Sequence, residues 1–220
     1  MPRHLSEQEI EDFRAQLCRV AERLFAEEGF EAVTMRRLAN ELGCSSMTPY
    51  RYFENKDAIL AAVRTQAFVR HGIRTEKLAA EHRDPVERLR AYARGYVAFA
   101  RDEPYAYRIM FELSAKTELE TLILDPATRN DVLRGWAPLV EVLTELIDRG
   151  LAEGDPITLA HLAWVMLHGL VTLELSNKFL IGRDLDQLIE PALDTFLRGI
   201  GAPPTSSESG DHHAPGITDD

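Results

Sequence analysis

The sequence has few of the residues that mark several classes of protein. It holds only two cysteines, Cys18 and Cys44, which are too few for a disulfide framework and lack the paired spacing of a zinc site. Glycine and proline, 13 and 11 of 220 residues, are too rare for a collagen-like or low-complexity chain. The polar N-terminal residues predict no secretory signal. The most apolar stretch, Leu159 to Leu175, carries polar residues and is shorter than the roughly 20 residues of a membrane span, so we expect a cytoplasmic protein without a membrane partner.

Signatures of catalysis are missing as well. The sequence shows no nucleophile–base arrangement, no His/Glu set at metal-binding spacing and no glycine-rich phosphate loop. The pair His212-His213 lies in a segment that we expect to be a disordered tail. We therefore predict no enzyme, no catalytic residue, no metal and no cofactor.

Basic residues are also in deficit, because 25 Lys and Arg face 36 Asp and Glu for a net charge of −11. Such a balance argues against nucleic acid as a partner. Local charge matters more than the sum, since salt screens charges more than about 8 Å apart. Between Thr34 and Lys56 the balance reverses: four cations, Arg36, Arg37, Arg51 and Lys56, stand against two glutamates, or 4 − 2 = +2.

Helical periodicity fills most of the chain, and no alternating strand pattern occurs. Ser6 to Glu9 forms a capping-box pattern, and Asp84-Pro85, Asp125-Pro126 and Asp155-Pro156 each place an N-cap carboxylate before a first-turn proline. Pro138 and Pro191 fall inside apolar periodic stretches and predict kinks or breaks. The pattern predicts an all-α protein of about nine helices, with domains at 1–54 and 55–200 and a disordered tail at 201–220.

Residues 34–53 have the layout of a helix-turn-helix: two short helices joined by a turn at Gly43-Cys44-Ser45. A recognition helix presents short polar groups at its N-terminus to the major groove. The residues at these positions are suited to bases, and others nearby are suited to phosphates. The predicted DNA contacts are Thr34, Arg36, Ser45, Ser46, Met47, Thr48, Tyr50, Arg51 and Lys56. For Arg36 and Arg37 two interpretations stay open: one of them reaches DNA, or both only lie on a solvated face. Tyr52 and Phe53 we expect to pack in a small core.

The string from Thr34 to Leu60, TMRRLANELGCSSMTPYRYFENKDAIL, resembles the TetR family of transcriptional regulators. It is similar to that family's Thr, Ala, Gly, Ser, Tyr-x-Tyr-Phe, Lys, Leu pattern, except that Pro49 stands where an aliphatic residue is more usual. The resemblance implies a dimeric DNA-binding repressor with a C-terminal domain that binds a small effector and dimerises. It also implies that Thr34, Tyr50 and Lys56 hold phosphates while Ser46, Met47 and Thr48 face bases.

The C-terminal half is less specific, although Trp164 to Leu170 resembles the Trp/His-Gly subclass of TetR C-terminal domains. Apolar residues at helical spacing are more often core than pocket, but a pocket between helices would use them. Both interpretations stay open for the aromatics of this half. The candidates for an effector pocket are Tyr96, Phe99, Met110, Trp136, Trp164 and His168.

Two late segments, Leu159–Leu175 and Leu185–Leu197, carry wide apolar stripes. With the family resemblance, these predict an isologous four-helix dimer interface. Its candidate residues are Leu159, Leu162, Met166, Leu170, Leu173, Leu188, Leu193 and Phe196.

The resulting hypothesis is a ligand-responsive transcriptional regulator: a repressor that a small, largely apolar effector releases from a palindromic operator. The helix from Asn55 to Gly72 would carry the signal between the domains. The competing hypothesis is a helical protein-binding adaptor without sequence-specific DNA binding, which would explain the acidic charge more simply.

Overall fold

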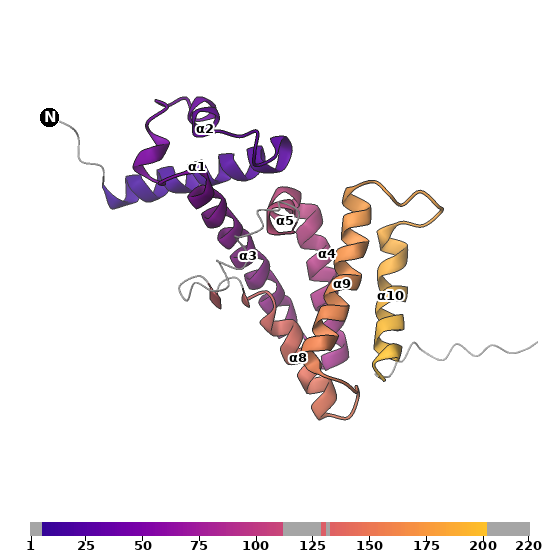
Figure 1. Ribbon diagram of the computed structural model, residues 1–220. Helices are drawn as coiled ribbons and strands as arrows, with labels where there is room; N and C mark the ends of the chain where they lie inside the picture. The colour runs from indigo at the N-terminus through magenta and orange to yellow at the C-terminus, as the bar shows by residue number, and fades with distance from the viewer. Residues whose placement is uncertain (1–5, 112–128, 131–132, 202–220) are drawn as a thin grey trace, which may run out of the picture.

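The computed structural model describes residues 6–111, 129–130 and 133–201, and within them every regular element is a helix (Figure 1). The predicted all-α fold is therefore confirmed. The predicted tail beyond residue 201 and the Asp125-Pro126 start lie outside the described residues. The elements are α1 (Glu7–Glu28), α2 (Met35–Glu41), the 3₁₀ helix η1 (Pro49–Arg51), α3 (Lys56–Ala80), α4 (Pro85–Asp102), α5 (Pro104–Phe111), α8 (Ala137–Asp148), α9 (Pro156–Leu175) and α10 (Leu185–Gly199).

The helices begin where short polar side chains satisfy the first free N–H groups. Ser6 accepts a hydrogen bond from the Glu9 amide, and the Glu9 carboxylate accepts one from the Ser6 amide, 2.8 Å away. Asp84 and Asp155 cap α4 and α9 before prolines in the first turn, as predicted. Asp184 begins α10 with a second capping box.

The N-terminal helices form a small unit around their own core (Figure 1). Leu17, Leu24 and Phe25 of α1 meet Leu38 of α2 and the first turns of α3, all within an apolar cluster closed to solvent. Phe53 joins this core and Tyr52 stacks on Phe13 with ring centroids 4.4 Å apart, so both residues pack inward as expected. One further member of this cluster, Ile109, comes from α5.

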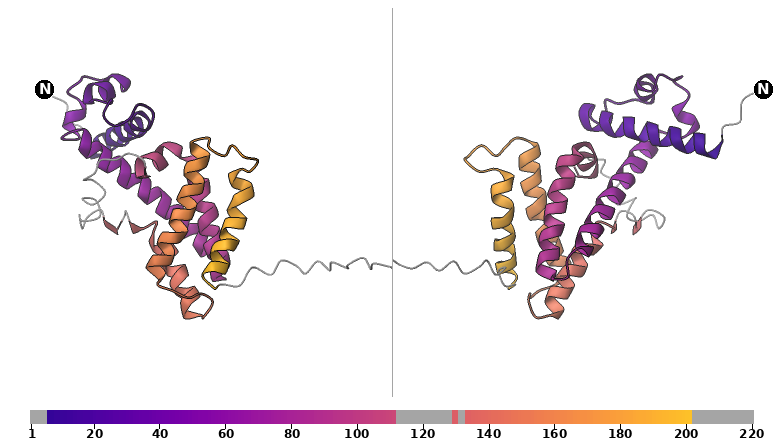
Figure 2. Two further views of the ribbon diagram at one scale, coloured as in Figure 1. Left: turned by 45° about the vertical axis from the view of Figure 1, so that its right-hand side comes forward. Right: turned by 180° about the vertical axis from the view of Figure 1, so that it is seen from behind.

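The rest of the chain forms a bundle in which α4 lies between α3 on one side and α8 and α9 on the other (Figure 2). α3 runs out of the N-terminal unit and along this bundle, so one continuous helix belongs to both parts (Figure 1). α10 packs beside α9, and their buried leucines share one core with the apolar face of α4. The two regions are thus joined by a helix rather than by a flexible linker.

Three helix predictions need correction or refinement. α3 continues through Gly72 to Ala80, and the glycine leaves room for Arg134, whose Cγ would lie only 2.9 Å from a Cβ at position 72. Pro138 lies in the first turn of α8, so the helix begins at Ala137 and the predicted break is confirmed. Pro191, in contrast, stays inside α10, which runs through it.

α9 is 20 residues long, and by length and composition it is apolar enough to cross a membrane. The prediction that this segment is too short for a span was therefore wrong, since the helix starts three residues before Leu159. Such a helix is weak evidence for a membrane, because core and interface helices pass the same test. What distinguishes α9 is that it is apolar on every face, including the one that the chain itself leaves uncovered.

Candidate nucleic-acid interface and buried cavity

α2 starts at Thr34, whose hydroxyl accepts a hydrogen bond from the Arg37 amide at 3.1 Å. The Arg37 side chain is committed to ion pairs with Glu28 of α1 at 2.9 Å and Glu41 at 2.7 Å. Arg36 is exposed and, within the described residues, makes no ion pair. Of the two arginines that the sequence left open, the structure therefore favours Arg36 as the one available to DNA.

The segment after α2 turns at Gly43, whose φ of +65° a side chain would strain. The predicted α-helix up to Phe53 is wrong in detail: a turn over residues 46–48 leads into the 3₁₀ helix η1. Pro49 is the physical reason, because it has no N–H to bond the carbonyl of Ser45. That carbonyl accepts from the Thr48 amide at 2.8 Å instead, which gives the tighter three-residue spacing.

This turn presents the side chains that sequence analysis assigned to DNA. Ser45, Ser46 and Arg51 are exposed, and Met47 and Tyr50 expose 66% and 49% of their surface, which is unusual for large apolar groups. Thr48 is half-buried and Pro49 is buried. The polar and apolar groups needed to contact base edges and thymine methyls therefore face solvent together.

Lys56 opens α3 beside this surface. Its Nζ donates to the carbonyl oxygen of Phe30 at 2.6 Å and lies 4.0 Å from the centroid of the Phe30 ring. Asn55 caps the same helix by accepting from the Ala58 amide. These contacts fix the ammonium group at a helix N-terminus, a place that favours phosphate.

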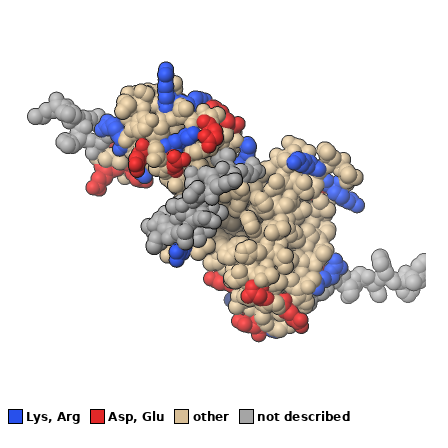
Figure 3. Space-filling model, in the orientation of Figure 1, with Lys and Arg blue, Asp and Glu red and all other residues tan. Residues whose placement is uncertain are grey.

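Charges of both signs lie over the N-terminal helices, with basic side chains projecting from their outer edge (Figure 3). Hydrogen bonds from Arg37 and then Arg23 lower the pKa of Glu41, so this carboxylate stays ionised and paired. The pairing removes Glu41 from the charge balance of the surface. Arg36, Arg51 and Lys56 remain against the exposed Glu54, so the small positive patch that the sequence predicted keeps its balance of 3 − 1 = +2.

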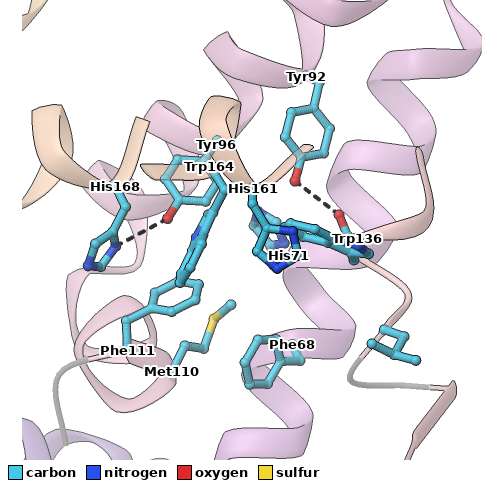
Figure 4. Close-up of a pocket in the computed structure, with 12 residues that line it drawn as sticks. Phe68, His71, Tyr92, Tyr96, Met110, Phe111, Trp136, His161, Trp164 and His168 are labelled. Carbon is cyan, nitrogen blue, oxygen red and sulfur yellow. Dashed lines mark hydrogen bonds between the residues drawn. The ribbon is translucent and has the colours of Figure 1, made fainter. Parts of the chain in front are cut away.

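The C-terminal bundle encloses a cavity of about 450 Å³ between α3, α4, α5, α9 and the segment before α8 (Figure 4). A volume of this size is ordinary for small-molecule sites, which span roughly 300–1,000 Å³. Its walls are mostly aromatic. The lining residues are Phe68, His71, Tyr92, Tyr96, Met110, Phe111, Leu133, Gly135, Trp136, His161, Trp164 and His168.

A polar network occupies one end of this cavity. The Tyr96 hydroxyl lies 3.4 Å from His168 Nδ1 (Figure 4). The Tyr107 hydroxyl lies 2.6 Å from the same nitrogen and 3.2 Å from the Tyr96 oxygen. Burial, with help from Tyr107, raises the pKa of Tyr96 well above its usual value, so the phenol keeps its proton. The network ties α4, α5 and α9 together.

His71 of α3 lies at another part of the wall. It is 4% exposed, and its Nε2 atom has no hydrogen-bond partner among the described residues. Burial, and then the charge of Arg74, lower the pKa of His71 to about 4, so the imidazole is neutral at physiological pH. Gly135 permits this arrangement, because a Cβ there would lie 2.5 Å from His71 Nδ1.

Five of the six pocket candidates line the cavity, namely Tyr96, Met110, Trp136, Trp164 and His168. Phe99 does not: it is fully buried and packs against His71 at 5.1 Å between ring centroids. Sequence analysis missed His71 and Phe68 on α3. Their three-residue spacing on one face of that helix was the available signal.

α5 joins the cavity to the N-terminal unit. Ile109 is completely buried within the N-terminal core, whereas the next two residues, Met110 and Phe111, line the cavity. The buried Arg64 of α3 donates through Nε to the Ile109 carbonyl at 3.0 Å. A displacement of α5 by a ligand would therefore move a residue inside the other core.

The outer face of α9 carries most of the predicted dimer residues. Leu162 is 53% exposed and Leu173 40%, and Met166, Leu170, Leu188 and Phe196 are half-buried. Leu159 and Leu193 lie in the core of the chain itself, at 7% and 1% exposure, and offer almost no area to a partner. Val165, 61% exposed, belongs to the same face and was missed.

Two family models match the chain. Residues 17–63 match the model described as "Bacterial regulatory proteins, tetR family", and residues 89–196 match "Tetracyclin repressor-like, C-terminal domain". This chain belongs to the tetR family. It is accordingly a ligand-responsive DNA-binding transcriptional regulator, and members of this family bind DNA and small-molecule effectors and are usually dimers. The Trp/His-Gly subclass stays a prediction.

No curated protein sequence matches this chain. Among solved structures, a protein of unknown function from Rhodococcus sp. RHA1 is 26% identical, with a TM-score of 0.69 over 91% of this chain and 99% of that one. FadR from Bacillus subtilis, solved with stearoyl-CoA, is 23% identical, with a TM-score of 0.70 over 84% and 98%. A TetR family regulator from Marinobacter aquaeolei VT8 is 20% identical, with a TM-score of 0.69 over 89% and 98%. These likenesses support the shared fold.

Proposed function

We propose that this regulator is a cytoplasmic homodimeric repressor, and not an enzyme, that a small, largely apolar effector releases from a palindromic operator. The observation that carries the proposal is the combination of an exposed reading surface over residues 45–51 with an aromatic cavity in the adjoining bundle. α3 and α5 connect the two. The adaptor hypothesis is not favoured, because the N-terminal unit matches a DNA-binding family.

On the operator, Ser46, Met47 and Thr48 face base edges while Thr34, Tyr50 and Lys56 hold phosphates. The exposure of Met47 supports this assignment, since an uncovered thioether can pack on a thymine methyl. Arg36, Ser45 and Arg51 contact the flanking backbone. Because η1 is short, the N-terminal end of the turn makes most of the contacts with the groove.

The dimer forms through α9 and α10. Leu162, Val165 and Leu173 give α9 an uncovered apolar face, and Gly169 lies on it with open space where a Cβ would stand, no described atom being within 4 Å of that point. A glycine at such a place lets a second helix approach closely. Two copies related by a twofold axis then bury these faces together and set the spacing of the reading surfaces.

The effector acts through differential affinity. The dimer has two conformations that differ in the spacing of the reading surfaces, and the effector binds one of them more tightly. An effector with equal affinity for both conformations would not change operator binding. The contacts of α5 supply the route, because Met110 and Phe111 meet the effector and Ile109 lies in the N-terminal core. A coupling of about 1–3 kcal/mol would change operator affinity about 5- to 150-fold.

The test is selection of duplexes from a random library by the full chain, followed by measured affinities. We expect a palindromic motif with half-sites about one helical turn apart. Thr48→Ala should relax the preference at one base step in each half-site, and Lys77→Ala, in the last turn of α3, should leave the motif unchanged. Enrichment of no sequence at low and moderate salt would contradict DNA reading and would favour the adaptor.

A further inference from the structure

The described walls of the cavity carry aromatic side chains and no charged residue. Among the described residues that line it there is no Asp, Glu, Lys or Arg, and the polar side-chain groups are those of histidine and tyrosine and the indole N–H groups of the two tryptophans. A charged ligand group buried among them would lose its hydration without gaining an opposite charge, which costs several kcal/mol. An uncharged ligand avoids that penalty.

The shape of the walls favours flat ligands. Trp164 lies 5.9 Å from Phe111 and 6.4 Å from Trp136, measured between ring centroids, and the planes of each pair are steeply inclined (Figure 4). Aromatic faces and edges of this kind offer stacked and edge-to-face contacts to a planar ring. A flexible acyl chain would gain only burial from the same walls and would lose more conformational freedom.

One wall residue lacks, within the described part of the chain, the hydrogen bond that its chemistry demands. Nearly all buried polar groups in proteins are hydrogen-bonded, and an exception calls for a cause. His71 Nε2 is such an exception, and its imidazole is edge-on to the rings of Tyr96 and Phe99 at 5.5 and 5.1 Å between centroids. The ring borders the cavity, so a ligand bound there lies beside an imidazole that has an unpaired nitrogen.

We propose that the effector is an uncharged, planar aromatic compound that carries a hydroxyl group, and that His71 is the residue that recognises this group. The proposal rests on the proposed function in that the bound compound is the effector. A neutral imidazole can accept from the hydroxyl or donate to it, whichever tautomer the ring adopts. The ligand thereby satisfies the nitrogen that the surrounding side chains leave unpaired.

The test uses four probes: 4-phenylphenol, biphenyl, biphenyl-4-carboxylate and stearoyl-CoA. Both tryptophans of the chain, Trp136 and Trp164, line the cavity, so intrinsic tryptophan fluorescence reports binding there directly. We expect saturable binding of 4-phenylphenol, with the matched carboxylate at least about tenfold weaker. A preference for the carboxylate or stearoyl-CoA, or no binding of 4-phenylphenol, would overturn the proposal.

Two substitutions test the role of His71. His71→Phe keeps a ring of similar size and should weaken 4-phenylphenol about 3- to 10-fold while leaving biphenyl nearly unchanged. His82→Phe, at an exposed histidine outside the cavity, is the matched control and should change neither affinity. Equal losses for both probes would show that His71 only shapes the wall and would overturn its assignment. His71→Gln, which retains hydrogen-bonding atoms, keeps the test valid if the Phe variant folds poorly.

The outcome separates this proposal from the proposed function. Failure of the probe series alongside sequence-specific DNA binding would remove the effector class alone. Probe binding by a chain that selects no DNA would leave the cavity chemistry standing and remove the repressor. Release of selected DNA by 4-phenylphenol, but not by biphenyl-4-carboxylate, would support both.

Discussion

The two functional regions of this protein are encoded in opposite ways. The reading surface is one continuous run, residues 34–56, whose functional side chains are mostly exposed. The cavity collects residues from position 68 to position 168 on several elements, and most of them are at least half-buried. A site made of neighbouring residues can be recognised in the sequence from the spacing of those residues. A site that the tertiary fold assembles from distant residues leaves only scattered aromatic residues in the sequence.

The two regions also differ in the burial of their ion pairs. The N-terminal ion pairs of Arg37 lie at the surface, with about a third of each side chain exposed. In the bundle, Arg90 is 4% exposed and its guanidinium meets Glu190 and Asp194 of α10. Water screens the ion pairs of Arg37, whereas it is excluded from one side of the ion pairs of Arg90. Two contacts of each kind therefore contribute unequally to stability.

The largest effect is expected on α5, the helix that reaches both the cavity and the N-terminal core. Ile109→Ala should lower the free energy of unfolding by about 4 kcal/mol, because it leaves a cavity in the N-terminal core. Denaturant unfolding measures this, with Ile73→Ala as the control, since Ile73 is 49% exposed and should change stability by less than about 0.5 kcal/mol. Similar effects at both positions would show that α5 does not insert into that core.

The next effect is a dependence of stability on pH that comes from His71 in the wall of the cavity. The folded pKa of His71, about 4, lies below the ordinary value of 6.5, so on acidification the unfolded chain takes up the proton first. Stability contributed by the neutral ring is complete above pH 6.5 and falls by roughly 3 kcal/mol between pH 6.5 and 4.

Unfolding free energies of the native chain and of His71→Phe across this range measure that loss. We expect the variant to have the shallower slope, and the same substitution at exposed His82 to leave it unchanged. Parallel curves for the native chain and His71→Phe would contradict the buried, neutral state of this histidine.

A smaller effect compares the two kinds of ion pair directly. The double variant Glu190→Gln and Asp194→Asn leaves the buried Arg90 charge without its carboxylates and should destabilise the chain by about 2 kcal/mol. Glu41→Gln removes an exposed partner of Arg37, a contact that water screens, and should destabilise the chain clearly less than the double variant. Thermal unfolding of the two variants measures both losses of stability. Equal losses would contradict the difference between the buried and the exposed ion pairs.

The smallest effect concerns the reading surface alone. Lys56→Ala should weaken binding to all duplexes about tenfold and reduce the slope of log affinity against log salt by about 1 per subunit. Lys77→Ala, in the last turn of the same helix, serves as the control and should leave both unchanged. A loss confined to one sequence would show that Lys56 reads bases.

Sequence analysis predicted the elements whose causes are local. The caps at Ser6, Asp84 and Asp155 each lie within three residues of the amide they satisfy, and the helix-turn-helix spacing is equally local. The exception is η1, where Pro49 acts over the same short range but the pattern predicted a second short helix up to residue 53.

The errors at the cavity and the dimer face have a different cause. Phe99 and Tyr96 lie on one helix within a turn of each other, yet only Tyr96 borders the cavity, because α3 places His71 over Phe99. On α9, Leu159 packs inside while Leu162 faces out, and a helix that is apolar all round gives no polar stripe to tell the two apart. Both distinctions are made by neighbouring helices and not by spacing along the chain.

Regulation by this protein requires that a dimer hold two reading surfaces at a separation that cavity occupancy changes. The distance between spin labels at Ser46→Cys in a Cys44→Ser background, measured with and without 4-phenylphenol, tests this requirement. We predict a narrow distribution near about 35 Å for the free chain, one turn of duplex, and a shifted one with the probe bound. A chain that shows no distance between copies, or one distribution that saturating probe leaves unchanged, would contradict it.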